Sequence, residues 1–203
     1  MISIVDYRAG NLRSVARACR EVGANAELVA EPERIATSER IIFPGVGTAE
    51  SGMRTLRKTG LDEALKSAFA SGTPILGICL GAQIILDHSE EGNENCLGLV
   101  TGKCRRFSPE SSELKVPHIG WNQVVVRQAH PLLDGFPDGA EFYFVNSYYP
   151  DPKDTNCVYG ESEYGHPFCA MLGRGNLFAT QFHLEKSGRW GLDLLKRFTL
   201  WDG

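Results

Sequence analysis

The segment "PILGICLGAQ", residues 74–83, places one cysteine, Cys79, between Gly77 and Gly81. An apolar run precedes the cysteine and an apolar, helix-like run follows it, so we predict a buried strand, a sharp turn and a helix. The turn of such a unit lies at the carboxyl edge of a parallel sheet, where ligands of α/β proteins bind. The segment therefore predicts an α/β fold and a location for a reactive site.

The first ninety residues alternate short apolar runs with amphipathic segments, which is typical of a mostly parallel central sheet flanked by helices. We predict strands at Ile2–Tyr7, Ala26–Val29, Arg40–Phe43 and Ile75–Ile78, and helices at Leu12–Val22, Glu50–Lys58 and Leu61–Ala70. Asn11 is expected to cap the first of these helices.

Beyond about residue 95 the pattern changes to additional short strands between Gly, Pro and Asp turns. The expected strands are "LVTGKCRRF", "WNQVVV", "EFYFVNSYY", "NCVYGE", "FCAML" and "NLFATQFH", and a final helix spans Gly188–Trp201. No linker or repeat interrupts the chain, so we expect a single domain over residues 1–203.

Composition limits the classes of function. The 203 residues are 42% hydrophobic and carry a net charge of −4, and Lys and Arg form no basic stripe, so we expect neither nucleic acid nor membrane as a partner. The start "MISIVDYRAG" lacks the pattern of a secretory signal, so a cytoplasmic location is expected. The six cysteines show no C-x-x-C pair, which argues against a zinc site and against structural disulfides.

Cys79 has two interpretations. In the first, Gly77-Ile78-Cys79-Leu80-Gly81 is a nucleophile elbow, in which the helix start favours the thiolate and the N–H of Leu80 points at a developing oxyanion. In the second, Cys79 is a small buried residue between glycines that let a helix pack closely. The motif alone does not decide between the two interpretations, so the decision depends on which other residues could act together with Cys79.

A candidate base lies in "ATQFHLEKS" near the end of the chain. If this segment is a strand, His183 and Glu185 point to the same face, and a carboxylate beside an imidazole fixes its tautomer and stabilises its charged form. The alternative is a strand end with two solvated polar groups. A third segment, Pro44-Gly45-Val46-Gly47 after an early strand, offers backbone N–H groups for a second oxyanion donor, or is an ordinary turn.

The three motifs "PGVG", "GICLGAQ" and "QFHLEKSG", in this order, resemble those of the class I glutamine amidotransferases, the Cys-His-Glu glutaminases. The resemblance covers nearly the whole chain. "KVPHIGWN" (115–122), "VDYRAGNL" (5–12) and "FYFVNSYY" (142–149) are similar to segments of the histidine-biosynthesis branch of this family, whose members are glutaminase subunits that pass ammonia to a separate (β/α)₈-barrel cyclase in a heterodimer.

The resemblance implies a role for each matching residue. The catalytic residues would be Cys79 as nucleophile, His183 as general base and then acid, and Glu185 as its orienter. Glutamine and its oxyanion would be held by Gly45, Val46, Gly47, Leu80, Gln83, Ser147 and Tyr148. The partner would be contacted by Asn11, Lys115, Pro117, His118, Trp121, Asn122 and Lys186, with Trp121 near the ammonia passage. The resemblance implies neither a metal nor an organic cofactor.

Two positions depart from the family pattern. Leu184 stands where the family has proline between the histidine and the glutamate, and Asn146 stands where this branch has histidine. Alternative functions are a paralogous amidotransferase subunit that feeds a different synthase, such as one for surface-sugar amidation, and a cysteine γ-glutamyl hydrolase. A non-catalytic binding subunit would have no reason to keep Cys79, His183 and Glu185 together.

Overall fold

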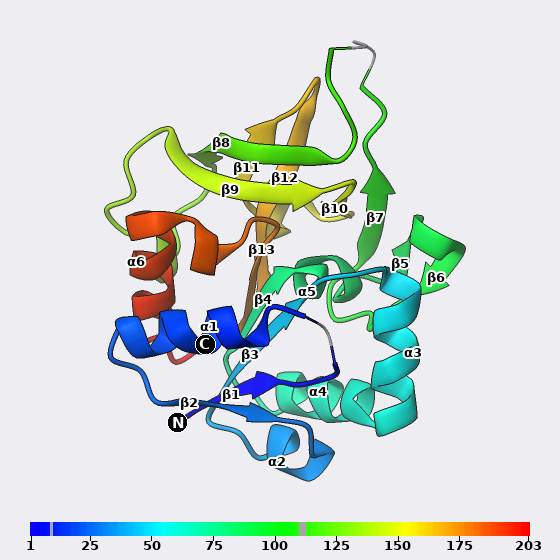
Figure 1. Ribbon diagram of the computed structural model, residues 1–203, viewed down its shortest axis with the longest axis vertical. Helices are drawn as coiled ribbons and strands as arrows, with labels where there is room; N and C mark the ends of the chain where they lie inside the picture. Colours follow the sequence, from blue (N-terminus) through cyan, green and yellow to red (C-terminus); the bar gives the residue numbers. More distant parts are fainter. Residues whose placement is uncertain (9, 110–112) are drawn as a thin grey trace.

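The strand before Cys79 lies in the middle of the central sheet. The computed structural model describes residues 1–8, 10–109 and 113–203, and in these ranges nine strands form one sheet, in the order β2-β1-β3-β4-β13-β12-β11-β8-β9. Its parallel strands are β1 (Ile2–Val5), β2 (Ala26–Val29), β3 (Arg40–Gly45), β4 (Ile75–Cys79) and β13 (Leu177–Thr180). The α/β fold and its parallel centre are confirmed (Figure 1).

Antiparallel strands extend this sheet from β13. They are β12 (Pro167–Arg174), β11 (Val158–Glu163), β8 (His118–Val126) and β9 (Ala140–Asn146). A second sheet contains β10 (Tyr148–Pro152), β7 (Gly102–Arg106), β5 (His88–Ser89) and β6 (Glu94–Asn95). The predicted strand "EFYFVNSYY" is therefore wrong as one unit, because the chain changes sheet at Ser147.

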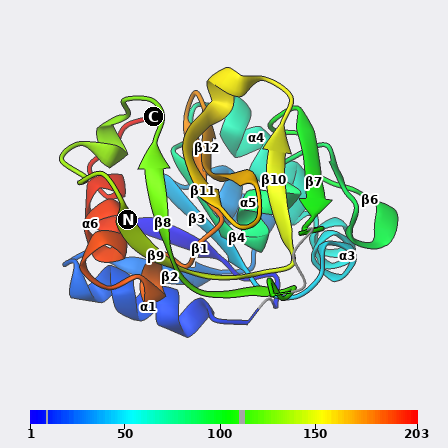
Figure 2. The same ribbon diagram turned by 90° about the horizontal axis from the view of Figure 1, so that it is seen from above.

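Helices cover both faces of the parallel part. They are α1 (Leu12–Glu21), α2 (Pro32–Ala36), α3 (Ala49–Thr59), α4 (Leu61–Ala70), α5 (Leu80–Ile84) and α6 (Gly188–Phe198). Short 3₁₀ turns are η1 (Glu91–Asn93), η2 (Pro131–Leu133), η3 (Thr155–Cys157) and η4 (Leu184–Lys186). Figure 2 shows α1 and α6 on one side of the strands and α3, α4 and α5 on the other. Among the described residues, no helix has both the length and the apolar character needed to span a bilayer.

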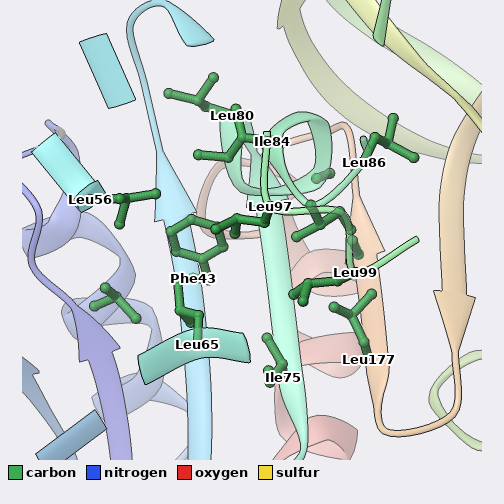
Figure 3. Close-up of a cluster of buried hydrophobic side chains, with 14 of the residues drawn as sticks. Phe43, Leu56, Leu65, Ile75, Leu80, Ile84, Leu86, Leu97, Leu99 and Leu177 are labelled. Atoms are coloured by element: carbon green, nitrogen blue, oxygen red, sulfur yellow. The ribbon is translucent and has the colours of Figure 1, made fainter. Parts of the chain in front are cut away.

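Successive residues of the parallel strands enter two different cores. Ile41 and Phe43 of β3 face α3, α4 and α5, whereas Ile42 between them faces α1 and α6. Both faces of the sheet are therefore buried, which explains why these strands read as continuous apolar runs. Figure 3 shows the first core, in which Phe43 and Ile75 of the sheet meet Leu65 of α4 and Leu80 of α5. Each fully buried side chain of this kind contributes about 1.5–3 kcal/mol to folding.

Three expectations about helix ends are corrected. Asn11 precedes α1 with a left-handed backbone, and its side chain makes no capping hydrogen bond. The helix α1 ends at Glu21, one residue before the predicted end. The last helix ends at Phe198 rather than Trp201, and the Arg40 side chain donates to the carbonyl oxygens of Thr199 and Trp201 at 3.0 and 2.6 Å.

Candidate active site

Cys79 occupies a strained turn between β4 and α5. Its φ and ψ are 55° and −108°, a combination that residues other than glycine rarely adopt. A methyl group at Gly81 would collide with the carbonyl oxygen of Phe43, and one at Gly77 would lie 2.9 Å from Cβ of Ala179. The flanking glycines thus allow α5 to pack on β3 and hold the turn at the carboxyl edge of the sheet, as the elbow motif predicts.

His183 and Glu185 form a buried pair beside this turn. The Nδ1 atom of His183 lies 2.7 Å from Oε1 of Glu185, and the two side chains are 4% and 1% exposed. Burial disfavours the charged imidazole, but hydrogen bonds to Cys79 and Glu185 outweigh it and raise the pKa of His183 from 6.5 to about 10. The structure therefore brings the three residues together, with His183 between the sulfur and the carboxylate.

The pair does not arise from strand alternation. β13 ends at Thr180, and Glu185 lies in the 3₁₀ turn η4 that follows His183. The backbone N–H of His183 donates to the carbonyl of Tyr143 at 3.0 Å, and the Ser187 hydroxyl donates to the carbonyl of His183 at 2.6 Å. The predicted proximity of His183 and Glu185 is confirmed. The tight turn η4, which hydrogen bonds hold against β9, produces it rather than a strand.

A cavity of about 320 Å³ opens beside Cys79 and His183. Its lining residues come from the strand ends, the elbow and the segment between β9 and β10: Val46, Gly47, Cys79, Leu80, Gln83, Glu91, Pro117, Val145, Asn146, Ser147, Tyr148, His183 and Lys186. Seven residues for substrate and oxyanion were expected, and all but Gly45 line this cavity. Gly45 lies directly behind it, paired with Cys79 across β3 and β4. The volume suits a small polar metabolite.

The end of the Pro44–Gly47 segment, Val46 and Gly47, lines the cavity and is exposed. Gly47 has a φ of 109°, which favours glycine, and Val46 is 38% exposed. Below it, the hydroxyl of Tyr7 sits where a side chain on Gly45 would be, and this hydroxyl is buried without a hydrogen-bond partner among the described residues. Burial, with a smaller contribution from Cys79, raises the pKa of Tyr7, so its phenol stays neutral.

Of the expected partner residues, Pro117 and Lys186 line the cavity. Lys115, Pro117 and Lys186 are exposed, and Trp121 is 54% exposed. Asn122 is half-buried, and its amide donates to the carbonyl of Glu163 at 2.8 Å.

Two of the expected partner residues have contacts inside the chain. His118 is 4% exposed and stacks between the rings of Phe144 and Tyr164, so it lies in the core rather than on a docking surface. Burial also lowers the pKa of His118 to about 4, so the ring is neutral. Asn11 is half-buried, and its amide donates to Oε1 of Glu185, so it contacts the catalytic candidates directly.

Sequence reasoning missed Gln181, Tyr7 and Glu91. Gln181 is fully buried, and its Nε2 lies 3.7 Å from Sγ of Cys79. Glu91 lines the cavity and accepts a hydrogen bond from the N–H of Ala49 at 2.7 Å. The signal for Gln181 was its place two residues before His183. Nothing local marks Glu91 or Tyr7, since long-range packing brings them to the site.

In the described ranges of the chain, no three or more His, Cys, Asp or Glu side chains gather as ligands of a metal ion would. What the arrangement offers is a thiol, an imidazole held by a carboxylate, and backbone N–H groups next to a small cavity. These groups can perform nucleophilic attack on a carbonyl carbon.

A cysteine elbow with a buried histidine–glutamate pair on a mixed α/β sheet defines the class of the thiol-dependent glutaminases. Residues 3–200 match the family model described as glutamine amidotransferase class-I, and the chain belongs to that family. It is 47% identical to the imidazole glycerol phosphate synthase subunit HisH of *Neisseria meningitidis*, over 98% of this chain and 99% of that protein. The HisH subunits of *Chromobacterium violaceum* and *Dehalococcoides mccartyi* are each 45% identical, over 100% and 98% of this chain and 98% and 96% of those proteins.

Solved structures agree on the fold. PurLQS from *Thermotoga maritima* superimposes with a TM-score of 0.74 at 18% identity, covering 98% of this chain and 97% of that one. A putative GMP synthase subunit from *Thermoplasma acidophilum* gives 0.72 at 20% identity, over 97% and 90% of the two chains. At these identities the likeness establishes the fold and nothing more specific.

Proposed function

We propose that this chain is the glutaminase subunit of an imidazole glycerol phosphate synthase in histidine biosynthesis, with a cytoplasmic location. The observation that carries the proposal is that Cys79 and His183 line one small polar cavity, while Nδ1 of His183 lies 2.7 Å from Oε1 of the buried Glu185. The identity of 45–47% to HisH subunits over nearly the whole chain supports the choice of pathway.

The reaction uses the groups in the cavity in order. The Cys79 thiolate attacks the side-chain amide carbon of glutamine, and the oxyanion that forms accepts hydrogen bonds from the N–H groups of Leu80 and of the Val46–Gly47 peptide. His183 protonates the departing nitrogen, which leaves as ammonia. Water then loses a proton to the same imidazole and attacks the thioester, which releases glutamate and restores the thiolate. Glu185 holds Nδ1 of His183 and thereby directs its other nitrogen to the sulfur.

Exposed apolar side chains on β8, beside β9, favour a docked partner. Ile119 and Trp121 are 60% and 54% exposed on one face of β8, and across β9 they face Val145 and Tyr143. The ammonium group of Lys186 lies 5.9 Å from the ring centre of Tyr143. Large exposed apolar side chains that adjoin a reactive cavity are typical of an interaction surface. We propose that a barrel cyclase binds here and receives the ammonia.

The two departures from the family pattern are compatible with this chemistry. Leu184 is 1% exposed, so it fills core volume, and η4 forms without a proline at this position. Asn146 is buried, and its amide donates to the carbonyl of Tyr148 at 2.9 Å. A paralogous amidotransferase with another synthase and a γ-glutamyl hydrolase are the outcomes that the experiments must separate from the proposal.

The first experiment measures glutamate release from glutamine by the chain alone and with the cyclase subunit and its ligand. A free glutaminase would waste glutamine, so we expect low turnover alone and a large increase in the complex, through reorientation of the Pro44–Gly47 segment. Equal rates would reject this coupling. Hydrolysis of a γ-glutamyl peptide in preference to glutamine would favour the hydrolase.

The second experiment uses Cys79→Ala in the complex. Synthesis of imidazole glycerol phosphate from glutamine should be abolished, while synthesis from added ammonium should persist, because the cyclase site is intact. Retention of glutamine-dependent synthesis would show that another group is the nucleophile. Failure of both nitrogen sources with a correctly assembled complex would point to a different acceptor reaction.

A further inference from the structure

A row of buried amides leads from the cavity wall to the sulfur of Cys79. Nε2 of Gln83 donates to the backbone carbonyl of Tyr148 and to Oε1 of Gln181, each at 2.9 Å. Nε2 of Gln181 in turn lies 3.7 Å from Sγ of Cys79. The contact with the sulfur is thus the end of a hydrogen-bonded series that begins at a main-chain carbonyl.

The backbone carbonyl of Tyr148 fixes the direction of every bond in this series. A carbonyl oxygen only accepts, so the atom of Gln83 that faces it is the NH₂ nitrogen. The same nitrogen faces Gln181, so Gln181 must present its oxygen there. Its NH₂ group is then left to point at the sulfur. Gln181 can therefore donate to Cys79 and cannot accept from it in this arrangement.

The surroundings make this donor effective. Gln181 is 0% exposed and Cys79 is 7% exposed, so water does not compete for the sulfur from that side. A hydrogen bond in a buried setting is electrostatically stronger than in water, and a donor favours the charged form of its acceptor over the neutral form. A thiol is a weak acceptor and a thiolate is a strong one, so an N–H aimed at the sulfur selects the thiolate.

We infer that Gln181 is a positioning residue that holds Cys79 in the thiolate form and in the orientation for attack, and that Gln83 keeps the Gln181 amide in its donating direction. The inference rests on the proposed function, since it takes Cys79 as the nucleophile. Both Nε2 protons of Gln83 are used in this series, so the atom that Gln83 offers to a substrate in the cavity is its Oε1. The Gln83 side chain therefore connects the substrate in the cavity with Gln181, the hydrogen-bond donor to Cys79.

The test is the pH dependence of Cys79 alkylation by iodoacetamide in the full chain, followed by mass spectrometry of the peptide that contains Cys79. Gln181→Met keeps the volume but removes the donor, so the pH of half-maximal alkylation should rise by about one unit. Gln181→Glu keeps the shape but presents a carboxylate, so the rise should be larger. In the complex with the cyclase, at a pH below both half-maximal values, Gln181→Met should lower kcat by up to about tenfold and leave KM within about twofold, because in that range a shift of one pH unit changes the thiolate fraction about tenfold.

Gln128→Met is the matched control. The Gln128 amide also donates to two acceptors, the carbonyl oxygens of Asn156 and Val158, but these lie away from the cavity. This variant should alkylate Cys79 with the wild-type pH profile. A wild-type profile in folded Gln181→Met would overturn the inference, as would an equal shift in Gln128→Met.

If Gln181→Met does not fold, Gln83→Met is measured in the same way. It leaves Gln181 in place but frees its amide to rotate, so a smaller shift to higher pH is expected, and an unchanged profile would overturn the inference. Alkylation needs no glutamine, so the two hypotheses fail separately. If the alkylation profile of Gln181→Met is shifted but the wild-type complex has no glutaminase activity, only the proposed function is rejected. If the wild-type complex is active but the profile of Gln181→Met is unshifted, only the role of Gln181 is rejected.

Discussion

Asn11 directly precedes the helix α1, at the usual position of a capping residue, but its side chain forms a hydrogen bond with Glu185 instead. Its amide donates to Oε1 of Glu185, the oxygen that also binds His183, and Oε2 of Glu185 is buried without a partner among the described residues. Local sequence suggested a cap because asparagine before a helix usually caps it. The left-handed backbone of Asn11, with φ of 75°, instead turns the amide toward η4. One donor thus supports the carboxylate that orients the histidine.

Asn11→Gly tests this donor without adding backbone strain, because glycine accepts the left-handed conformation. The loss of a hydrogen bond to a buried carboxylate should lower the free energy of unfolding by about 1.5–3 kcal/mol, and glutamine turnover in the complex should fall. Asn93→Gly is the control, since Asn93 is also left-handed, with φ of 52°, but lies exposed in η1. Urea unfolding of both variants checks the prediction. Equal stability of the two would mean that the Asn11 amide contributes nothing.

The pKa of His183 should depend on its interaction with Cys79. Burial alone would lower the pKa of His183, and the hydrogen bonds to Cys79 and Glu185 raise it to about 10. The folded-state pKa lies above the ordinary 6.5, so the protonated imidazole stabilises the fold. This contribution is fully present below about pH 6.5 and is lost as the pH rises through about 10.

Cys79→Ala should lower the pKa of His183, because the contact with Cys79 is removed while burial remains. NMR titration of the His183 ring in wild type and variant measures both values. The wild-type free energy of unfolding should decline as the pH rises from 6.5 toward 10, and in the variant the decline should be smaller and should end at lower pH. An unchanged His183 pKa in Cys79→Ala would contradict the contact.

At the scale of elements, the elbow depends on how closely α5 approaches β3. A Cβ at Gly81 would collide with the carbonyl oxygen of Phe43, which belongs to rigid backbone inside the sheet. Helix propensity favours alanine over glycine by about 0.5–1 kcal/mol, but the collision outweighs it. We expect Gly81→Ala to lower the free energy of unfolding by about 2–3 kcal/mol and to displace Cys79 from His183, which abolishes glutamine turnover.

Gly52→Ala separates this effect from helix propensity. Gly52 lies in α3, and its Cβ would meet the side chains of Leu80, Ile84 and Tyr7 at 3.4–3.5 Å, which is ordinary van der Waals contact. This variant should be as stable as wild type or slightly more stable in urea. If Gly81→Ala and Gly52→Ala behave alike, the tight approach of α5 to β3 is not what the elbow requires.

The elements also show how far the sequence determines the fold. The runs that became β1, β2, β3 and β4 were predicted to within one or two residues because short, mostly apolar runs stand between polar helical segments, and in β1, β3 and β4 nearly every residue is buried. The five-residue helix α2 was missed, since so short a segment has no full period to recognise. The break at Ser147 was also missed, because β9 and β10 pair with different strands and only the partners decide where the chain changes sheet.

The same distinction holds for the site. Cys79, His183 and Glu185 were found because each stands in a motif whose chemistry is readable locally. His118 was assigned to the partner surface because the resemblance of "KVPHIGWN" implied it, but alternation along β8 turns the ring inward against Phe144. Gln181 was overlooked because its role depends on a contact with residue 79, about a hundred positions away in the chain. Polar networks of this kind are set by the fold as a whole.

At the scale of the whole molecule, the two edges of the parallel strands differ. Gly45 and Cys79 end their strands beside the cavity, whereas Arg40, the first residue of β3, binds the carbonyl of Trp201 at the opposite edge. The exposed Ile119 is paired across β8 and β9 with Val145, which lines the cavity, and Leu200, 75% exposed, adjoins Trp201. Both regions expose apolar side chains, but only the first is next to the proposed glutaminase site. We therefore expect a partner that receives ammonia to dock at the cavity edge.

Ile119→Lys tests this direction of docking. A lysine at an exposed strand position should leave the chain folded, but burying its charge against a partner is costly, so the affinity for the cyclase should fall at least about tenfold. Leu200→Lys makes the same change at the opposite edge and should bind as wild type does. Titration calorimetry gives the affinity, and glutamine turnover in the complex shows whether activation falls in parallel. Equal loss of affinity in both variants would mean that the added charge, and not its place at the cavity edge, weakens binding. Loss of affinity only in Leu200→Lys would place the partner at the opposite edge, where ammonia could not pass directly from Cys79 to its acceptor.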